Sequence, residues 1–428
     1  MVIHIVKQGD TIFNVAQQYS VNPDILAVNN GVSGNANLAL GQALVVVFPL
    51  VTHIVREGET LFSIARDYGV SVNSLYRNNL ILESKPVVFT GMELIIESEK
   101  NLIGGYMTGG YAYPFISTDL LDSTLPFMSA LMPFTYGFKS DGSLVPIDDT
   151  VMISRAEVYG TKPVMHLSTL TEEDVFSVEL ATQFLNNRPV WGTLINNVLA
   201  VLRQKGYYGL DVDFEFLGLE NAAKYAEFIT FARETLNPQG YPVMVALAPK
   251  TSVTQPGALY QGHDYNALGQ AANTVLIMTY EWGYTFGPPM AISPIQPVTD
   301  VVEFAVSQID SRKIFLGVSN YGYDFVLPFV PGESRAESLS FIQANELAVQ
   351  MGSRIEYDEK AQAPFFRYSA NGEQHEVWYE DARSLSVRMN LLRDYNLRGA
   401  LYWNLMRPNP HNLVVINNML DVLPFNLF

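Results

Sequence analysis

The stretch Gly209-Leu-Asp-Val-Asp-Phe-Glu215 has the pattern of a buried strand that ends in acidic side chains. Its carboxylates recur at every second residue, at Asp211, Asp213 and Glu215. Side chains two residues apart on a strand point to the same face, so we expect these carboxylates to lie together, with neighbours roughly 6–7 Å apart. Like charges this close raise one another's pKa, and we expect at least one to hold a proton near neutrality, as a general acid must.

Apolar runs of this kind recur eight times between residues 101 and 428. Helical spacing appears between them, most clearly over 191–205, 222–236 and 381–395. Continuous apolar runs suit parallel strands that are buried on both faces, and eight strand–helix alternations predict an α/β fold, the (β/α)8 or TIM barrel. The runs lie at 102–106, 130–136, 163–167, 209–214, 243–247, 274–280, 314–320 and 399–404.

The interval between the seventh and eighth runs is long, and its short alternating pieces predict a small α+β insertion at about 331–378. Barrel enzymes carry their chemistry where strands end, at the C-terminal face. Several aromatic and polar residues follow the runs and are candidates for binding a substrate, with plain packing as the alternative for each aromatic ring. They are Tyr106, Tyr111, Tyr113, Tyr280, Glu281, Trp282, Tyr284, Asn320, Tyr321 and Trp403.

The acidic stretch resembles the DxxDxDxE signature of family 18 glycoside hydrolases, the chitinase-like enzymes, with further matches at Met278-Thr-Tyr280 and Trp403. The resemblance covers essentially all of residues 101–428. It implies that Glu215 is the general acid, that Asp213 orients the acetamido group of the substrate, and that Asp211 tunes Asp213. It also implies that Tyr280 hydrogen-bonds the acetamido group and that Trp403 forms the floor of the −1 subsite.

Family 18 enzymes are an exception among retaining glycosidases, because the substrate supplies the nucleophile. The resemblance therefore implies attack by the acetamido oxygen, an oxazolinium intermediate and no need for a metal or another cofactor. Two positions depart from the family pattern. The first aspartate of the signature is Tyr208, and Glu281 stands where chitinases commonly carry aspartate, so we expect a divergent but active branch.

The N-terminal part contains an internal repeat. The segment His4–Phe13 aligns with His53–Phe62 at an offset of 49, and Gly41 pairs with Gly91 after a one-residue slip. Each copy has the pattern of a strand, two helices and a second strand. The repeat predicts two small βααβ domains, at 1–48 and 49–98, that precede the barrel at 101–428.

These copies resemble LysM modules, which bind polymers that contain N-acetylglucosamine. The resemblance implies a groove between the turn after the first strand and the segment before the second, near Asn35–Leu38 in one copy and Pro86–Phe89 in the other. Two tethered copies would raise the effective concentration of a weak binder. The implied turn residues are Gly9, Asp10, Thr11 and Ile12, and Gly58, Glu59, Thr60 and Leu61.

Composition excludes several other functions. The formal charge of −17 is poorly suited to nucleic acid or to an anionic membrane surface. The absence of Cys removes thiolate metal sites and Cys nucleophiles, and the six scattered His residues lack metal-ligand spacing, so we expect no metal site. We expect neither a signal peptide nor a membrane span, since the N-terminus has the pattern of a folded strand and no apolar stretch approaches roughly 20 residues.

Two LysM-like modules joined to a divergent family 18 barrel resemble the spore cortex-lytic enzymes of Bacillus-type bacteria, the SleL/YaaH group. The resemblance implies a monomeric N-acetylglucosaminidase that acts on cortex peptidoglycan or its fragments, in the coat or cortex region of the spore, without a cleaved signal peptide. Spore cortex contains muramic lactam, which has no free acetamido arm, so substrate assistance favours glucosamine over the lactam at −1. Ordinary N-acetylmuramic acid is not excluded by this reasoning. The alternatives are a chitinase that acts on chitin oligomers and a catalytically silent lectin or coat protein.

Overall fold

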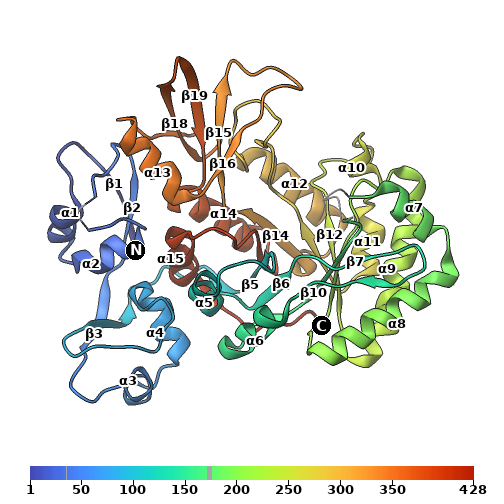
Figure 1. The fold of residues 1–428 in the computed structure, drawn as a ribbon, viewed down its shortest axis with the longest axis horizontal. Helices are drawn as coiled ribbons and strands as arrows, with labels where there is room; N and C mark the ends of the chain where they lie inside the picture. Colours follow the sequence, from blue (N-terminus) through green and yellow to red (C-terminus); the bar gives the residue numbers. More distant parts are fainter. Residues whose placement is uncertain (35, 171–175) are drawn as a thin grey trace.

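The computed structural model describes residues 1–34, 36–170 and 176–428. Two small modules lie against one flank of a large barrel, and a separate antiparallel sheet projects from the barrel (Figure 1). The first module comprises β1 (Val2–Ile5), α1 (Ile12–Tyr19), α2 (Pro23–Asn29) and β2 (Ala43–Val46). The second comprises β3 (Pro49–Ile54), α3 (Leu61–Tyr68), α4 (Val72–Asn78) and β4 (Glu93–Ser98), and both have the predicted βααβ order.

The same helix start is built in each module because the repeat preserves a capping threonine. Thr11 Oγ1 accepts a hydrogen bond from the Asn14 amide at 3.1 Å, and Thr60 Oγ1 accepts one from the Ser63 amide at 3.1 Å. The side chains of Asn14 and Ser63 accept in return from the threonine amides, which completes a capping box in both helices. The two antiparallel strand pairs then close over the buried faces of the helices.

The predicted barrel is present, and all eight apolar runs form its strands. The third run is divided at Val164 into β9 and β10, but the Val164 amide still donates to the Leu131 carbonyl at 2.9 Å, so the sheet continues around. The strands are β5 (Gly104–Ala112), β6 (Ala130–Pro133), β9 (Lys162–Pro163), β10 (Met165–Ser168), β11 (Leu210–Asp213), β12 (Val243–Leu247), β13 (Thr274–Ile277), β14 (Ile314–Ser319) and β20 (Gly399–Trp403).

Helices surround this barrel, and the buried apolar faces of all but the short helix at 258–261 pack against its outer surface. None of the helices in the described ranges is long and apolar enough to cross a membrane. The helices are α5 (Thr118–Thr124), α6 (Thr150–Tyr159), α7 (Val178–Leu185), α8 (Arg188–Lys205), α9 (Ala222–Leu236), α10 (Ala258–Gln261), α11 (Tyr265–Ala271), α12 (Ile295–Gln308), α14 (Ala382–Asp394) and α15 (Pro410–Met419). A small hairpin, β7 (Gly137–Phe138) and β8 (Leu144–Val145), follows β6.

The first barrel strand lies further along the chain than predicted. We expected it at 102–106, and β5 runs from Gly104 to Ala112. Its central part holds Gly109 and Gly110 and therefore lacks an apolar signal. A Cβ on Gly109 would come within 2.9 Å of the Ala130 carbonyl, so glycine allows β5 and β6 to approach closely.

The segment after α15 closes the N-terminal end of the barrel. The short strand β21 (Leu420–Val422) pairs in parallel with the start of β5, and the buried side chains of Phe425 and Leu427 then join the cluster that fills the barrel interior. Tyr208 packs against Phe425, and its hydroxyl accepts a hydrogen bond from the Leu427 amide at 3.2 Å. Tyr208, which stands in place of the first aspartate of the family signature, therefore helps to close this end of the barrel.

The insertion between the seventh and eighth barrel strands is an antiparallel sheet with one helix, and it begins earlier than the expected residue 331. Its first strand follows β14 almost directly. The elements are β15 (Gly322–Leu327), β16 (Glu337–Leu339), α13 (Phe341–Gln350), β17 (Glu356–Asp358), β18 (Ala363–Ala370) and β19 (Glu373–Trp378).

The two modules are packed against the barrel, and the sequence did not predict this contact. Helix α15 lies against both modules (Figure 1). His411 Nε2 lies 2.7 Å from Asn30 Oδ1 in the first module, and the Asn417 side-chain amide donates to the Arg77 carbonyl in the second at 3.0 Å. Asn418 also donates to the Glu99 carbonyl at 2.9 Å. These bonds fix both modules relative to the barrel.

Candidate active site

The three carboxylates of the acidic stretch lie at the C-terminal end of β11. Asp211 is fully buried, Asp213 is 5% exposed, and Glu215 is half-buried two residues beyond the last strand residue. In the parallel register with β10, His166 stands beside Asp211. Burial therefore decreases along the stretch, from a carboxylate inside the barrel to one at its mouth.

Two hydrogen-bonding groups hold Asp211. The Tyr111 hydroxyl donates to Asp211 Oδ2 at 2.8 Å, and His166 Nδ1 lies 2.8 Å from the same oxygen. Tyr111 is almost fully buried, so it supports the carboxylate and does not form part of a sugar-binding surface. The pKa of Tyr111 is raised by its burial and by the charge of Asp211, which keeps the hydroxyl protonated as a donor.

His166 lies between the two inner carboxylates. Its Nε2 lies 3.8 Å from Asp213 Oδ2, beyond hydrogen-bond distance, and this buried nitrogen has no hydrogen-bond partner among the described residues. Asp213 Oδ1 is likewise buried without a partner in the described ranges. Phe134 stacks on the imidazole at a centroid distance of 4.9 Å and holds its plane. A small movement of Asp213 would pair these two unsatisfied groups.

Burial and neighbouring charge shift the acidity of the outer pair. Burial, together with the charge of Glu215, raises the pKa of Asp213 well above its usual range, although His166 acts in the opposite direction. Burial, together with the charge of Glu281, raises the pKa of Glu215 to about 7. Glu215 is therefore partly protonated at neutral pH, as a general acid requires.

Tyr280, Glu281 and Tyr321 form the side of the site next to β13 and β14. Burial and the carboxylates Asp213 and Glu215 raise the pKa of Tyr280 well above its usual range, so its hydroxyl remains a donor. The Tyr321 hydroxyl donates to Glu281 Oε1 at 3.1 Å. Glu281 has a left-handed backbone, with φ of 66°, and its side chain is exposed at the mouth of the barrel.

Trp403 ends β20, and its ring lies among other aromatic rings. Its centroid is 4.8 Å from that of Phe134 and 5.8 Å from that of Tyr111. Asn320 is buried and donates to the carbonyls of Asn404 and Arg407, both at 3.0 Å, so it anchors the loop that follows Trp403. Trp282 is half-buried, and its amide donates to the Ile292 carbonyl at 3.0 Å.

Tyr106 does not belong with these residues, contrary to its selection as a substrate contact. It lies near the start of β5, and Leu423 from the closing segment donates to its carbonyl at 3.0 Å. The site is at the other end of the same strand, where Tyr111 meets Asp211. The error follows from placing the first strand too early, which made Tyr106 the apparent strand end.

Sequence reasoning did not select His166 as a site residue. The available signal was a histidine within an apolar run, two residues before the strand ends, in the strand next to the acidic one. A buried histidine in a strand is compatible with simple packing, so this signal alone did not distinguish the two roles.

The module residues selected from the repeat lie in matching turns. Asp10 Oδ2 accepts from the Lys7 amide at 2.7 Å and lies 3.0 Å from His4 Nε2. Glu59 makes the equivalent contacts with the Arg56 amide and with His53 Nε2, both at 2.7 Å. These carboxylates hold the turns in shape. Thr11 and Thr60 cap the following helices, Ile12 and Leu61 are buried, Gly9 and Gly58 have positive φ, and Asn35 lies outside the described residues.

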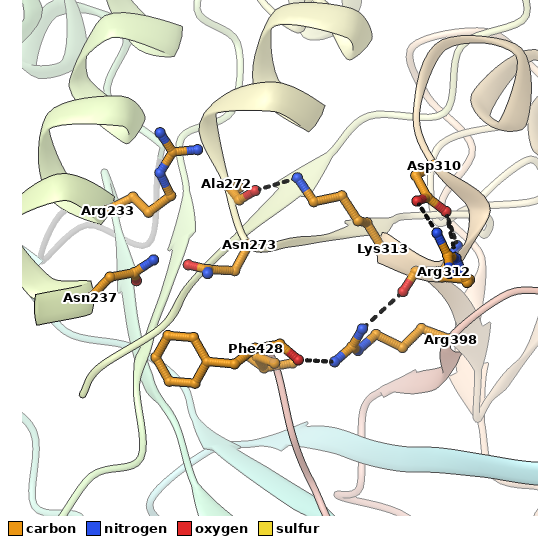
Figure 2. Close-up of a pocket in the computed structure, with 10 residues that line it drawn as sticks. Arg233, Asn237, Ala272, Asn273, Asp310, Arg312, Lys313, Arg398 and Phe428 are labelled. Carbon is orange, nitrogen blue, oxygen red and sulfur yellow. Dashed lines mark hydrogen bonds and ion pairs between the residues drawn. The ribbon is translucent and has the colours of Figure 1, made fainter.

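A cavity of about 590 Å³ opens at the opposite, N-terminal end of the barrel, so it is separate from the carboxylates. Figure 2 shows its basic lining, in which Lys313 donates to the Ala272 carbonyl and Arg398 to Phe428. The acceptors of these two donors are backbone oxygen atoms, one at the end of α11 and one in the closing segment. Within the described ranges, no group of three or more His, Asp or Glu side chains is arranged to hold a metal ion.

Residues 185–407 match the family described as Glycosyl hydrolases family 18, and residues 4–47 and 53–97 each match the LysM domain. The chain is 38% identical to the cortical fragment-lytic enzyme of Bacillus subtilis (strain 168) over 99% of both chains. It is 32% identical to the putative sporulation-specific glycosylase YdhD of the same organism, over 95% of both chains.

Solved structures agree with these matches. The spore cortex-lytic enzyme SleL of Bacillus megaterium QM B1551 superposes with a TM-score of 0.83 at 34% identity, over 99% of both chains. A chitinase from Chromobacterium violaceum, at 22% identity and a TM-score of 0.67, covers 73% of this chain and 99% of its own, and shares the fold. The chain is therefore a glycosidase that belongs to glycosyl hydrolase family 18, and it carries two LysM domains before its catalytic barrel.

Proposed function

We propose that this enzyme is an N-acetylglucosaminidase that hydrolyses spore cortex peptidoglycan or its fragments, with the acetamido group of the substrate as nucleophile. One observation carries the proposal: a half-buried Glu215, with its pKa raised to about 7, stands beside a buried Asp213. Full-length similarity to cortical fragment-lytic enzymes supports the choice of substrate and a spore-associated role.

In the first step, the acetamido oxygen of the −1 sugar attacks the anomeric carbon and the bond to the leaving sugar breaks. Glu215 gives its proton to the departing glycosidic oxygen. Asp213 accepts from the acetamido N–H and stabilises the positive oxazolinium ion. Tyr280, whose hydroxyl remains protonated, donates to the acetamido oxygen and orients it.

In the second step, the Glu215 carboxylate takes a proton from water, and the water oxygen adds to the anomeric carbon. The oxazolinium ring opens and restores the acetamide, so the product retains the configuration of the substrate. The positive intermediate needs an ionised Asp213 at this stage, whereas burial favours its neutral form.

His166 would act as a positioning residue that favours the ionised form of Asp213. Its Nε2 faces Asp213 at 3.8 Å, while Nδ1 is held by Asp211, which Tyr111 also supports. A rotation of Asp213 toward His166 would satisfy both buried groups. This arrangement supports a carboxylate relay that functions without the first aspartate of the family signature, which is Tyr208 here.

The proposal is tested by the identity of the new reducing ends. Cortex fragments and chitin oligomers are digested side by side, reduced with borohydride and examined by mass spectrometry. We expect reduced N-acetylglucosamine ends from cortex fragments, and loss of these products in Glu215→Gln. Reduced muramic ends would contradict the bond assignment, faster cleavage of chitin would favour the chitinase alternative, and no products from either would favour a silent lectin.

A further inference from the structure

The two modules differ at the segment that leads into their second strands. Ala39 and Phe89 occupy equivalent positions, two residues before Gly41 and Gly91. Ala39 is 4% exposed and belongs to an apolar cluster with Phe341 of the insertion. Phe89 is 70% exposed. This position is therefore buried in one copy and exposed in the other.

The insertion of the barrel domain contacts the first module at Leu40 and Gly41. The Ile355 amide donates to the Leu40 carbonyl at 2.8 Å, and a Cβ on Gly41 would lie 1.9 Å from the Ile355 carbonyl oxygen. A Cβ on Gly91 would meet no described atom within 4 Å. The insertion of the barrel domain thus covers Ala39 and Gly41 of the first module, next to β17, while the side chain of Leu40 is 43% exposed.

In the second module, the open segment lies beside the turn that follows β3. The Gly91 amide donates to the Val55 carbonyl at 2.8 Å, which places residues 87–91 next to the turn that begins at Arg56. Phe62, just after this turn, is 65% exposed, and Val87 is 55% exposed. Exposed aromatic and apolar side chains beside a polar turn suit a sugar ring, which offers an apolar face and a rim of hydroxyl groups.

We propose that the second module carries the glycan-binding surface and that the first module mainly packs against the barrel domain. The binding surface is formed by Phe62, Val87, Phe89 and the turn at Gly58–Thr60. The occupant is a neutral N-acetylated glycan strand, which suits a strongly acidic chain. The inference rests on the proposed action on peptidoglycan and assigns the attachment of the enzyme to one copy of the repeat.

The internal repeat provides a matched control, because Phe13 is the equivalent of Phe62 and is 68% exposed. Binding of full-length protein to purified cortex peptidoglycan is measured by co-sedimentation, with Glu215→Gln in every variant to prevent hydrolysis. We expect Phe62→Ala and Phe89→Ala each to raise the Kd about fivefold, since an aromatic contact contributes about 1 kcal/mol. Phe13→Ala should change the Kd less than about twofold. These exposed substitutions should leave the melting temperature unchanged, which confirms folding.

A Phe13→Ala variant that binds as weakly as Phe62→Ala would overturn the assignment, because both copies would then contribute. Equal binding by all three variants and their parent would also overturn it, because neither aromatic surface would then hold the glycan. In that second case the reducing-end assay remains a separate test of the hydrolytic function, so the two failures can be distinguished.

Discussion

At the scale of single residues, the acidity of Glu215 is set by its surroundings. Desolvation makes the larger contribution to its raised pKa, and the negative charge of Glu281 adds to it. The protonated form of Glu215 is the active one in the first step. Activity should therefore be high below about pH 7 and fall as the pH rises through that value.

Glu281→Gln should shift the alkaline limb of kcat/KM to lower pH. Removing the neighbouring negative charge makes ionisation of Glu215 easier, so the pKa of Glu215 falls. Glu281 is exposed and partly screened by solvent, which limits the expected shift to about half a pH unit. The pH profile of kcat/KM on a soluble fragment measures this, and a limb that stays in place or moves to higher pH would contradict the electrostatic role of Glu281.

His166→Asn should lower kcat about tenfold to a hundredfold with little change in KM, since His166 supports Asp213 only as charge develops. His166 lowers the pKa of Asp213, so its loss should raise that pKa and move the acidic limb of kcat to higher pH. Phe134→Leu is the control, because Phe134 stacks on the imidazole but carries no charge. An equal shift of the acidic limb in both variants would reduce the role of His166 to packing.

At the scale of elements, strand periodicity predicted both the eight barrel strands and the common location of the acidic side chains. The prediction was wrong where backbone contacts override composition. In β5, Gly109 and Gly110 are required by close approach to neighbouring elements and carry no apolar signal, so the strand was placed too early and Tyr106 was selected in error. The partners of Asp211 come from β5 and β10, and no local pattern in β11 indicates them.

The glycines before β2 and β4 allow a test of the contact between the first module and the insertion. Both Gly41 and Gly91 have positive φ, at 81° and 90°, so alanine at either position is strained. Gly91→Ala should lower the free energy of unfolding by about 1 kcal/mol, the usual cost of that backbone conformation. Gly41→Ala should lower it by about 3 kcal/mol, because its Cβ would also collide with the Ile355 carbonyl. Denaturant unfolding measures both, and equal losses would mean that the contact between the first module and the insertion is not maintained in solution.

At the scale of the whole molecule, the sequence repeat predicted two modules but not their fixed positions. The contact between Asn30 and His411 joins residues 381 positions apart, and sequence periodicity carries no information at that distance. Sequence periodicity likewise did not predict that the segment near Phe425 closes the N-terminal end of the barrel beside Tyr208. Docking of the modules means that a glycan held by one of them would meet the barrel in a restricted set of orientations.

In the proposed mechanism, the acetamido group of the substrate is the nucleophile and Glu215 is the acid. The most direct test compares the cleavage rate of cortex fragments before chemical de-N-acetylation, after it, and after re-N-acetylation. We expect cleavage to fall at least about a thousandfold on the de-N-acetylated fragments and to return on the re-acetylated ones, because only an acetamido oxygen can form the oxazolinium ion. Undiminished cleavage of the de-N-acetylated fragments would contradict the mechanism.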